Sequence, residues 1–111
     1  MGPMNIKLIN ANPLESEDDV CVEQLPIILG RASEAGIQLN DPWVSRRHCV
    51  VDQQGGALII RDQGSTHGTF VNGHPVTEAV LRPGDKLVIG MSTFIVDYDS
   101  STVEIPAGVS A

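Results

Sequence analysis

The sequence has few basic residues, few cysteines and no long apolar run. Seven Lys and Arg residues stand against 14 Asp and Glu residues, so the 111-residue chain carries a formal charge of −7. Nucleic acids bind basic protein faces that release counterions, and anionic membranes attract basic segments, so neither is expected as a partner. Any anion that this chain binds must be held by a local cluster that works against the global field.

Only two cysteines are present, Cys21 and Cys49, which are too few for a disulfide framework or a metal motif. Both lie in apolar, strand-like surroundings, which predicts two small buried thiols, and a single bridge between them is the less favoured alternative. The apolar run at residues 4–9 is too short for a membrane span or a signal peptide. We therefore expect a cytoplasmic protein, and no cofactor or bound metal is expected.

Glycine and proline divide the chain into pieces that are too short for most helices. Between these turns lie β-branched or alternating runs at residues 6–9, 20–22, 24–29, 49–51, 58–61, 86–89 and 93–98. Many short strands separated by turns predict an all-β sandwich or barrel. A sandwich is favoured, because two packed sheets make the most economical use of strands whose apolar residues alternate with polar ones. We expect one domain at residues 4–98, preceded by an expression remnant at residues 1–3 and followed by a loosely ordered tail at residues 99–111.

Two tight turns are specified locally. Asn72-Gly73 is the strongest hairpin signal, because both residues tolerate the positive φ angles of a type I′ turn. Pro83-Gly84 predicts the next turn, since proline presets φ and glycine accepts the strained position. In the last apolar run, Phe94, Val96 and Tyr98 fall on one face of the predicted strand.

Three segments carry the chemistry: Gly30-Arg31, Ser45-Arg46-Arg47-His48, and the run from Gly64 to Gly73. Each places arginines, hydroxyls or glycines where a strand is predicted to end. An arginine fork, hydroxyl donors and glycine-freed backbone N–H groups are what a protein needs to hold a phosphate. In these segments Gly64 and Gly68 let the backbone turn its N–H groups toward a ligand.

In this order and at this spacing, the three segments, together with residues 81–90, resemble the forkhead-associated (FHA) domain over about residues 24–98. The resemblance implies a β-sandwich of eleven mostly antiparallel strands in two sheets, which binds phosphothreonine peptides through loops at one apex. By position it implies phosphate contacts from Arg31, Ser45, Arg46 and Thr66. It also implies that His48 ties down the loop carrying Ser45, and that Asn72-Gly73 forms the supporting hairpin.

One position departs from the family pattern. Where the family usually has an asparagine that holds the peptide backbone, this chain has His67. An imidazole can donate with one nitrogen and accept with the other, so His67 is expected to replace the amide in part, with a different geometry. Ser65, from the same loop, is expected as a further donor to the phosphopeptide.

Several residues have a second interpretation. Ser45 and Thr66 could only cap turns, because hydroxyls often do so. Arg47 is expected on a solvated face. Trp43 could pack locally or present an edge to a peptide, and the sequence does not separate these two possibilities.

Other classes of protein were weighed against the phosphate-binding module. An enzyme would need Ser45 with His48, or Ser65 with His67, plus Asp62 or Asp85, yet neither serine lies in a recognisable nucleophile turn. A metal site lacks ligand spacing among the residues His48, His67, His74, Cys21 and Cys49. A phosphate-independent interaction or oligomerisation sandwich is the main alternative, and it would not depend on Arg31.

The sequence thus predicts a non-enzymatic phosphothreonine-binding module of Ser/Thr-kinase signalling that is part of a larger signalling protein. The expected partners are a phosphothreonine-containing protein or peptide and an upstream Ser/Thr kinase. Residues flanking the phosphate would be read by the loops at residues 32–35 and 41–44 and by His67, with His74 less favoured.

Overall fold

A computed structural model of the chain describes residues 6–11 and 19–98. The expectations for residues 1–3 and for the tail at residues 99–111 lie outside this part of the chain. Within it, all regular secondary structure is β-strand, and no helix is long and apolar enough to cross a membrane.

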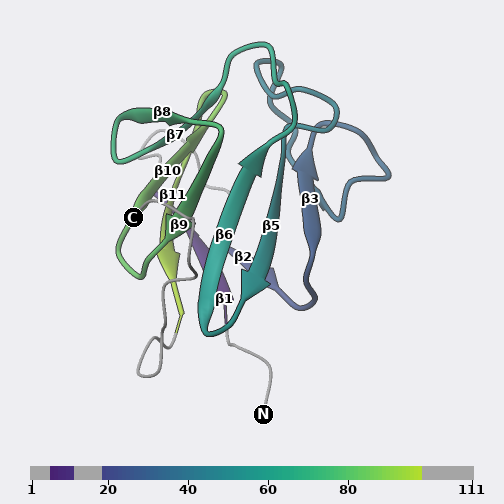
Figure 1. The fold of residues 1–111 in the computed structure, drawn as a ribbon. Helices are drawn as coiled ribbons and strands as arrows, with labels where there is room; N and C mark the ends of the chain where they lie inside the picture. The colour runs from purple at the N-terminus through teal and green to yellow at the C-terminus, as the bar shows by residue number, and fades with distance from the viewer. Residues whose placement is uncertain (1–5, 12–18, 99–111) are drawn as a thin grey trace.

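Eleven strands are present in the described residues (Figure 1). They are β1 Ile6–Asn10, β2 Val20–Val22, β3 Ile27–Gly30, β4 Ile37–Gln38, β5 Cys49–Gln54, β6 Ala57–Asp62, β7 Thr69–Val71, β8 His74–Val76, β9 Glu78–Leu81, β10 Lys86–Ile89 and β11 Ser92–Asp97. One sheet has the order β2-β1-β11-β10-β7-β8, and the other has the order β4-β3-β5-β6-β9. Among the pairs given by register, only β3 and β4 run parallel. The predicted two-sheet, mostly antiparallel fold is confirmed.

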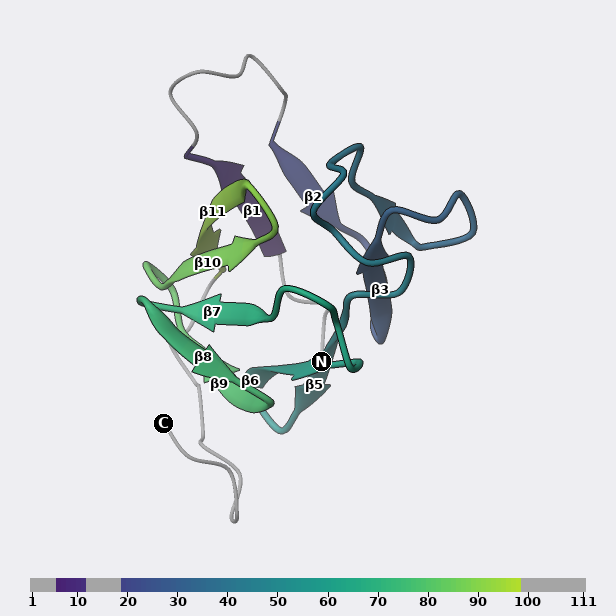
Figure 2. The same ribbon diagram turned by 90° about the horizontal axis from the view of Figure 1, so that it is seen from above.

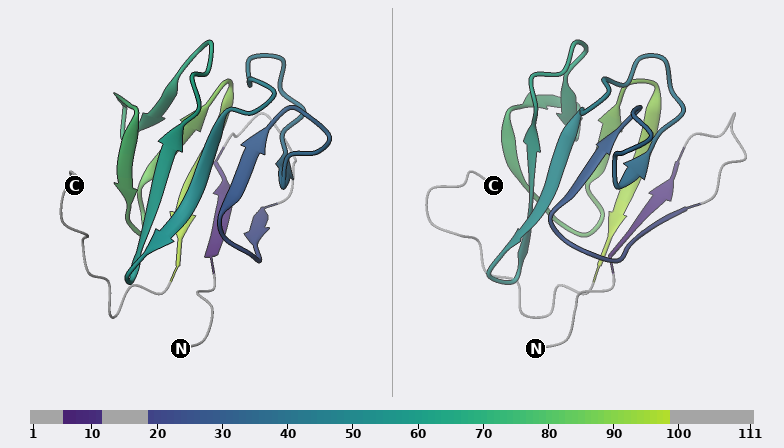
Figure 3. Two further views of the ribbon diagram at one scale, coloured as in Figure 1. Left: turned by 45° about the vertical axis from the view of Figure 1, so that its right-hand side comes forward. Right: turned by 90° about the vertical axis from the view of Figure 1, so that its right-hand side faces the viewer.

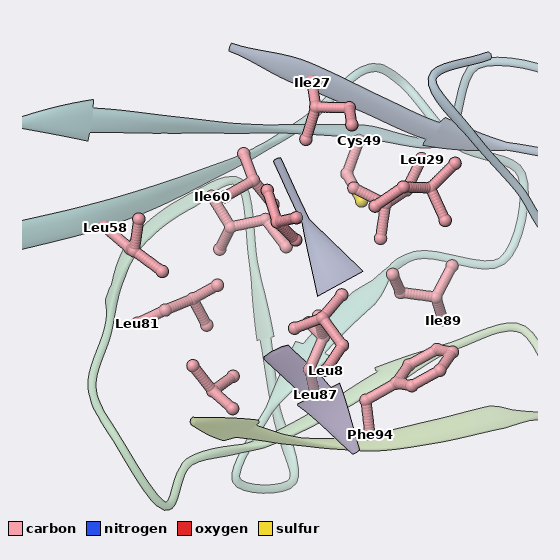
Figure 4. Close-up of a cluster of buried hydrophobic side chains, with 14 of the residues drawn as sticks. Leu8, Ile27, Leu29, Cys49, Leu58, Ile60, Leu81, Leu87, Ile89 and Phe94 are labelled. Atoms are coloured by element: carbon pink, nitrogen blue, oxygen red, sulfur yellow. The ribbon is translucent and has the colours of Figure 1, made fainter. Parts of the chain in front are cut away.

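The core lies between the sheets because alternate residues of each strand point inward. Figure 4 shows Leu8, Leu87 and Phe94 from one sheet facing Leu29 and Ile60 from the other. Each fully buried Leu or Ile side chain contributes about 1.5–3 kcal/mol relative to an exposed one, so this cluster is the main source of stability.

The pattern predicted for the last strand is confirmed: Phe94, Val96 and Tyr98 are buried, and Asp97 is exposed. The strand predicted at residues 24–29 begins later, at Ile27. Pro26 has no N–H group to donate to a sheet ladder, which accounts for the later start.

Both predicted turns are confirmed. Asn72 and Gly73 have φ angles of 53° and 83°, the positive values of a type I′ turn, and join β7 to β8. At the next turn Gly84 has φ of 91°, and the N–H of Asp85 donates to the carbonyl of Arg82 at 3.0 Å.

The prediction that both cysteines are buried is wrong for Cys21. Cys49 is buried, and burial raises the pKa of its thiol to about 12. Cys21 is exposed, because Val22 takes the inward position on the short edge strand β2. Both thiols are free, so the bridge between them does not form in this structure.

The registers bring several loops to one end of the sandwich. Leu29 pairs with Cys49, and Cys49 pairs with Asp62, so the end of β3, the start of β5 and the end of β6 lie side by side. Ile89 pairs with Thr69, which places the β10–β11 turn beside the start of β7. This end is uppermost in Figure 1, and Figure 2 looks down onto it.

Candidate functional site

The backbone after β3 is bonded directly to the segment that carries Ser45. The N–H of Arg31 donates to the carbonyl of Ser45 at 3.0 Å, and the N–H of Ala32 donates to that of Arg46 at 3.2 Å. A Cβ on Gly30 would lie 2.0 Å from the carbonyl oxygen of Arg46, so any larger residue there would push the two segments apart. Arg31 and Ser45-Arg46 are therefore brought together by the backbone itself.

The Arg31 side chain is exposed, and one hydrogen bond to the backbone holds its guanidinium. Its Nε donates to the carbonyl of Val44 at 3.1 Å. No carboxylate among residues 6–11 and 19–98 forms an ion pair with Arg31 or Arg46, so neither guanidinium is neutralised there. The Arg31 guanidinium, whose forked N–H groups suit phosphate oxygens, thus belongs to an exposed side chain.

His48 connects the three segments through hydrogen bonds. Its ring is buried, with Nδ1 accepting the N–H of Ser45 at 3.0 Å and Nε2 donating to the carbonyl of Gly68 at 2.8 Å. Its backbone N–H donates to Leu29, and its carbonyl accepts the N–H of Gln63. Because both ring nitrogens are engaged with the backbone, His48 cannot take a proton from the Ser45 hydroxyl as an enzyme would require.

Ser45 and Thr66 meet across the gap between the loops. The N–H of Thr66 donates to Ser45 Oγ at 3.0 Å, which links the β4–β5 loop to the β6–β7 loop. Accepting this bond leaves the Ser45 O–H proton available as a donor. Thr66 is exposed beside it. The two residues named from the sequence, Ser45 and Thr66, therefore lie together at the apex.

Asp62 organises the β6–β7 loop, a role that the sequence reasoning missed. Its Oδ1 accepts the hydroxyls of Ser65 at 2.5 Å and Thr69 at 2.7 Å, and its Oδ2 accepts the N–H groups of Gly64 and Ser65 at 3.0 Å each. Burial acts to raise the pKa of Asp62, but these hydrogen bonds outweigh it and lower that pKa. Aspartate directly before Gln-Gly-Ser is typical of an Asx-type turn, and that signal was available.

The same contacts engage Ser65 within its own loop. Its N–H and hydroxyl both donate to Asp62, and its Oγ also accepts the N–H of Gly68 at 3.0 Å. No donor of Ser65 is left for a ligand in this arrangement. In this arrangement Ser65 holds the shape of the loop, and a bond from Ser65 to a phosphopeptide stays a prediction.

Trp43 and His67 form an aromatic pair beside these hydroxyls. Their ring centroids are 4.5 Å apart and the ring planes are tilted by 59°. Both side chains are exposed, so Trp43 packs locally and also presents a face to solvent. His67 thus lies on the loop surface, at the position where the family pattern has asparagine.

Charge at the apex is mixed. Arg46 and Arg47 are both exposed, the latter as expected. The pKa of Glu34 is lowered, first by a hydrogen bond from its own backbone and by the Ser33 hydroxyl, and then by the charges of Arg46 and Arg47. Glu34 is therefore an ionised group near these two arginines, and sequence reasoning had not singled it out.

Asn72, Gly73 and His74 lie outside the apex. Asn72 bonds to the β9–β10 turn, where its Nδ2 donates to Asp85 and its Oδ1 accepts the N–H of Lys86. The hairpin pairs β8 with β7, and its support of the site stays a prediction. His74 lines a separate hollow of about 290 Å³ with Val76 and Arg82. No cluster of His, Cys, Asp and Glu that could hold a metal occurs in the described ranges.

Comparison with known proteins adds independent information. The family model described as FHA domain matches residues 27–90. The glycogen accumulation regulator GarA of Mycolicibacterium smegmatis is 46% identical over 61 residues, which are 55% of this chain and 39% of that protein. The chain spans less than half the length of the curated relatives it matches.

Two solved structures are also similar. An FHA domain analysed for phosphothreonine-dependent interactions has a TM-score of 0.76 and 33% identity, covering 84% of this chain and 95% of that one. The FhaA FHA domain, solved in complex with the intracellular domain of another protein, has a TM-score of 0.71 and 33% identity, covering 85% and 99%.

Proposed function

This chain belongs to the FHA domain family, and from that premise we propose that it is a phosphothreonine-peptide binding module of Ser/Thr-kinase signalling. The observation that carries the proposal is the convergence of Arg31, Ser45 and Thr66 at one apex, on loops bonded to one another. The guanidinium supplies the cationic fork, and the hydroxyls supply neutral donors. Together they complement a group with nearly two negative charges and three acceptor oxygens.

The scaffold below these groups supports recognition because it leaves little to reorganise on binding. His48 and Asp62 hold the two loops through partly buried hydrogen bonds, and neither side chain needs to move to expose Arg31. A preformed site avoids much of the entropy lost when flexible loops become ordered. Arg46, exposed next to Ser45, is assigned as the second cation for the phosphate.

Preference for phosphothreonine over phosphoserine requires contact with one additional methyl group. Such a contact is worth on the order of 1 kcal/mol, or roughly fivefold in affinity. The peptide backbone would be held by His67 in place of the family's asparagine, with the imidazole donating or accepting one hydrogen bond.

The module is assigned no catalytic role, since both ring nitrogens of His48 are bonded to the backbone and cannot activate Ser45. Its partners in this proposal are a phosphothreonine-containing protein and the Ser/Thr kinase upstream of it, and its compartment is the cytoplasm. The folded unit is assigned to residues 4–98. A phosphate-independent interaction or oligomerisation domain is the alternative that the test must separate.

The test measures binding of phosphothreonine, phosphoserine and unphosphorylated versions of a degenerate peptide library to the wild type and to Arg31→Ala. Charge-assisted hydrogen bonds are worth about 1.5–3 kcal/mol each, so Arg31→Ala should weaken phosphothreonine binding by about 10- to 100-fold. Arg82→Ala, which removes an exposed guanidinium from the β9–β10 turn, is the matched control and should bind like the wild type. Equal binding of phosphorylated and unphosphorylated peptides, unaffected by Arg31→Ala, would establish the phosphate-independent alternative.

A further inference from the structure

Three buried apolar side chains lie apart from the core between the sheets. Ala57 and Ile59 on β6 are fully buried, Val80 on β9 is 4% exposed, and the three form a cluster of their own. Along β6 they alternate with Leu58 and Ile60, which belong to the core. Because successive side chains of a strand point to opposite faces of the sheet, this outer cluster lies on the outward face, which is turned to the viewer in Figure 1.

The outer cluster spans the middle and the edge of the five-stranded sheet. Ile59 pairs with Asp52 of β5 on one side and with Val80 of β9 on the other. β9 is the last strand of that sheet, and the left view of Figure 3 shows it beside β6, green beside teal. A sheet face that water reaches carries mostly polar residues, so a buried apolar row on the outward face needs a further layer above it.

Arg61 shields one end of this row. Its Nε donates to Glu78 at 2.6 Å and its Nη1 lies 3.6 Å from Asp52, so the guanidinium bridges β9 and β5 across β6. Ala57 lies four residues before Arg61 on the same strand, about 13 Å away and beyond the reach of that side chain. A single copy of the chain buries the whole cluster, so the rest of the cover belongs to the chain itself.

The described part of the chain ends next to this face. The hydroxyl of Tyr98, the last described residue, donates at 2.5 Å to the carbonyl of Leu81, which follows Val80 in β9. Residues 99–111 follow. An extended chain advances about 3.3 Å per residue, so four or five residues, roughly 13–17 Å, suffice to pass round the sheet edge at β9 and reach β6.

We infer that residues 99–111 fold back over the outward face of β6 and β9, and that Val103 and Ile105 complete the cover of the outer cluster. The run from Thr102 to Ile105 alternates polar and apolar residues, so an extended segment presents Val103 and Ile105 on one side. The inference adds this segment to the folded unit assigned to residues 4–98. It concerns a face of the sheet and does not depend on the apical phosphate site.

Other parts of the chain fit this role less well. Residues 1–5 precede β1, which lies one strand farther along the six-stranded sheet than β11, and they include no β-branched residue. Residues 12–18 join β1 to β2, at the far edge of that same sheet. Residues 99–111 have the greater length, the nearer starting point and the alternating apolar pair.

The experiment measures thiol labelling of this face in the full chain. Val80→Cys places a reporter thiol in the outer cluster, and Cys21→Ser removes the exposed native thiol. Cys49 is buried in the core with a thiol pKa of about 12, so its labelling reports only global opening. We expect Val103→Ser/Ile105→Ser to accelerate labelling at position 80 by about tenfold or more relative to Cys49, because the apolar cover is lost.

The matched control is Thr102→Ser/Glu104→Gln, which changes the other side of the same segment and should label at the rate of the natural tail. Equal rates in the two double variants would overturn the inference, and so would fast labelling at position 80 with the natural tail. A rate that falls as the protein concentration rises would assign the cover to a second copy and would also overturn it. In the unsubstituted chain, NOEs between the methyl groups of Ile59 and Ile105 would support the inference directly.

Discussion

At the scale of single residues, the conformation of the β6–β7 loop depends most on Asp62. Its carboxylate accepts bonds from two hydroxyls and two backbone N–H groups, and these hold its pKa below the ordinary value of 3.8 although burial acts in the opposite direction. A folded-state pKa below the unfolded value means that the ionised carboxylate stabilises the fold at neutral pH. This contribution is lost as the pH falls through the folded-state pKa.

We predict that Asp62→Asn lowers the free energy of unfolding at pH 7 by about 1–3 kcal/mol, because an amide turns one acceptor oxygen into a donor facing other donors. Urea unfolding at pH 7 and at pH 3 measures the effect. The difference from the wild type should shrink at pH 3, because the stability that comes from the lowered pKa of Asp62 declines once the pH falls below the ordinary value of 3.8. Asp97→Asn, which changes an exposed carboxylate on β11, is the control. An undiminished difference at pH 3 would show that the charge of Asp62 is not the cause.

At the scale of elements, the β7–β8 turn shows how one residue serves two purposes. Asn72 adopts a positive φ of 53°, and its side chain bonds to Asp85 at 3.1 Å and to the N–H of Lys86 at 3.0 Å. Its backbone N–H also donates to the carbonyl of Lys86 at 2.8 Å. The turn thus closes the hairpin and ties it to the start of β10.

Two substitutions separate the effect of the positive φ of Asn72 from the effect of its side-chain hydrogen bonds. Asn72→Gly keeps the freedom to adopt positive φ and loses only the side-chain bonds, so we expect a loss of about 1 kcal/mol in the free energy of unfolding. Asn72→Ala loses the bonds and also strains the backbone, which should bring the loss to about 2–3 kcal/mol. Denaturant unfolding of both variants measures the two losses in free energy. Equal losses would mean that backbone strain at this position is negligible.

At the scale of the whole molecule, Tyr98 joins the two sheets where the described chain ends. Tyr98 follows β11 in one sheet, and its hydroxyl donates to the carbonyl of Leu81, in β9 of the other sheet, at 2.5 Å. Asp41 makes a second connection at the apex, between the β4–β5 loop and the β10–β11 turn. The sandwich is thus linked by polar contacts as well as by its apolar core.

We predict that Tyr98→Phe lowers the free energy of unfolding by about 1–2 kcal/mol, because it leaves the Leu81 carbonyl without its donor and keeps the packing of the ring. The slope of that free energy against denaturant concentration should not change, since both sheets would still unfold together. Two separate transitions in Tyr98→Phe would show instead that this single bond couples the sheets.

The sequence by itself determined the features that depend on neighbouring residues. Alternation placed Phe94, Val96 and Tyr98 inward because strand periodicity is local. Asn72-Gly73 specified its turn because positive φ is a property of those residue types. The order and spacing of the segments from Gly30 to Gly73 were enough to indicate the family, which the family model then matched.

Only the tertiary structure decided which donors are free and which are already used. Ser65 and Thr66 are adjacent hydroxyl residues, yet the Ser65 hydroxyl bonds to Asp62 and its neighbour lies exposed beside Ser45. Cys21 faces outward because the pairing of β2 with β1 puts Val22, opposite the buried Ile6, on the inward face, which the three residues of β2 alone do not reveal. The hydrogen bond from the N–H of Met91 to the Asp41 carboxylate joins residues fifty positions apart. The contacts of Thr66 with Ser45 and of Met91 with Asp41 arise from the packing of distant segments, which no local pattern encodes.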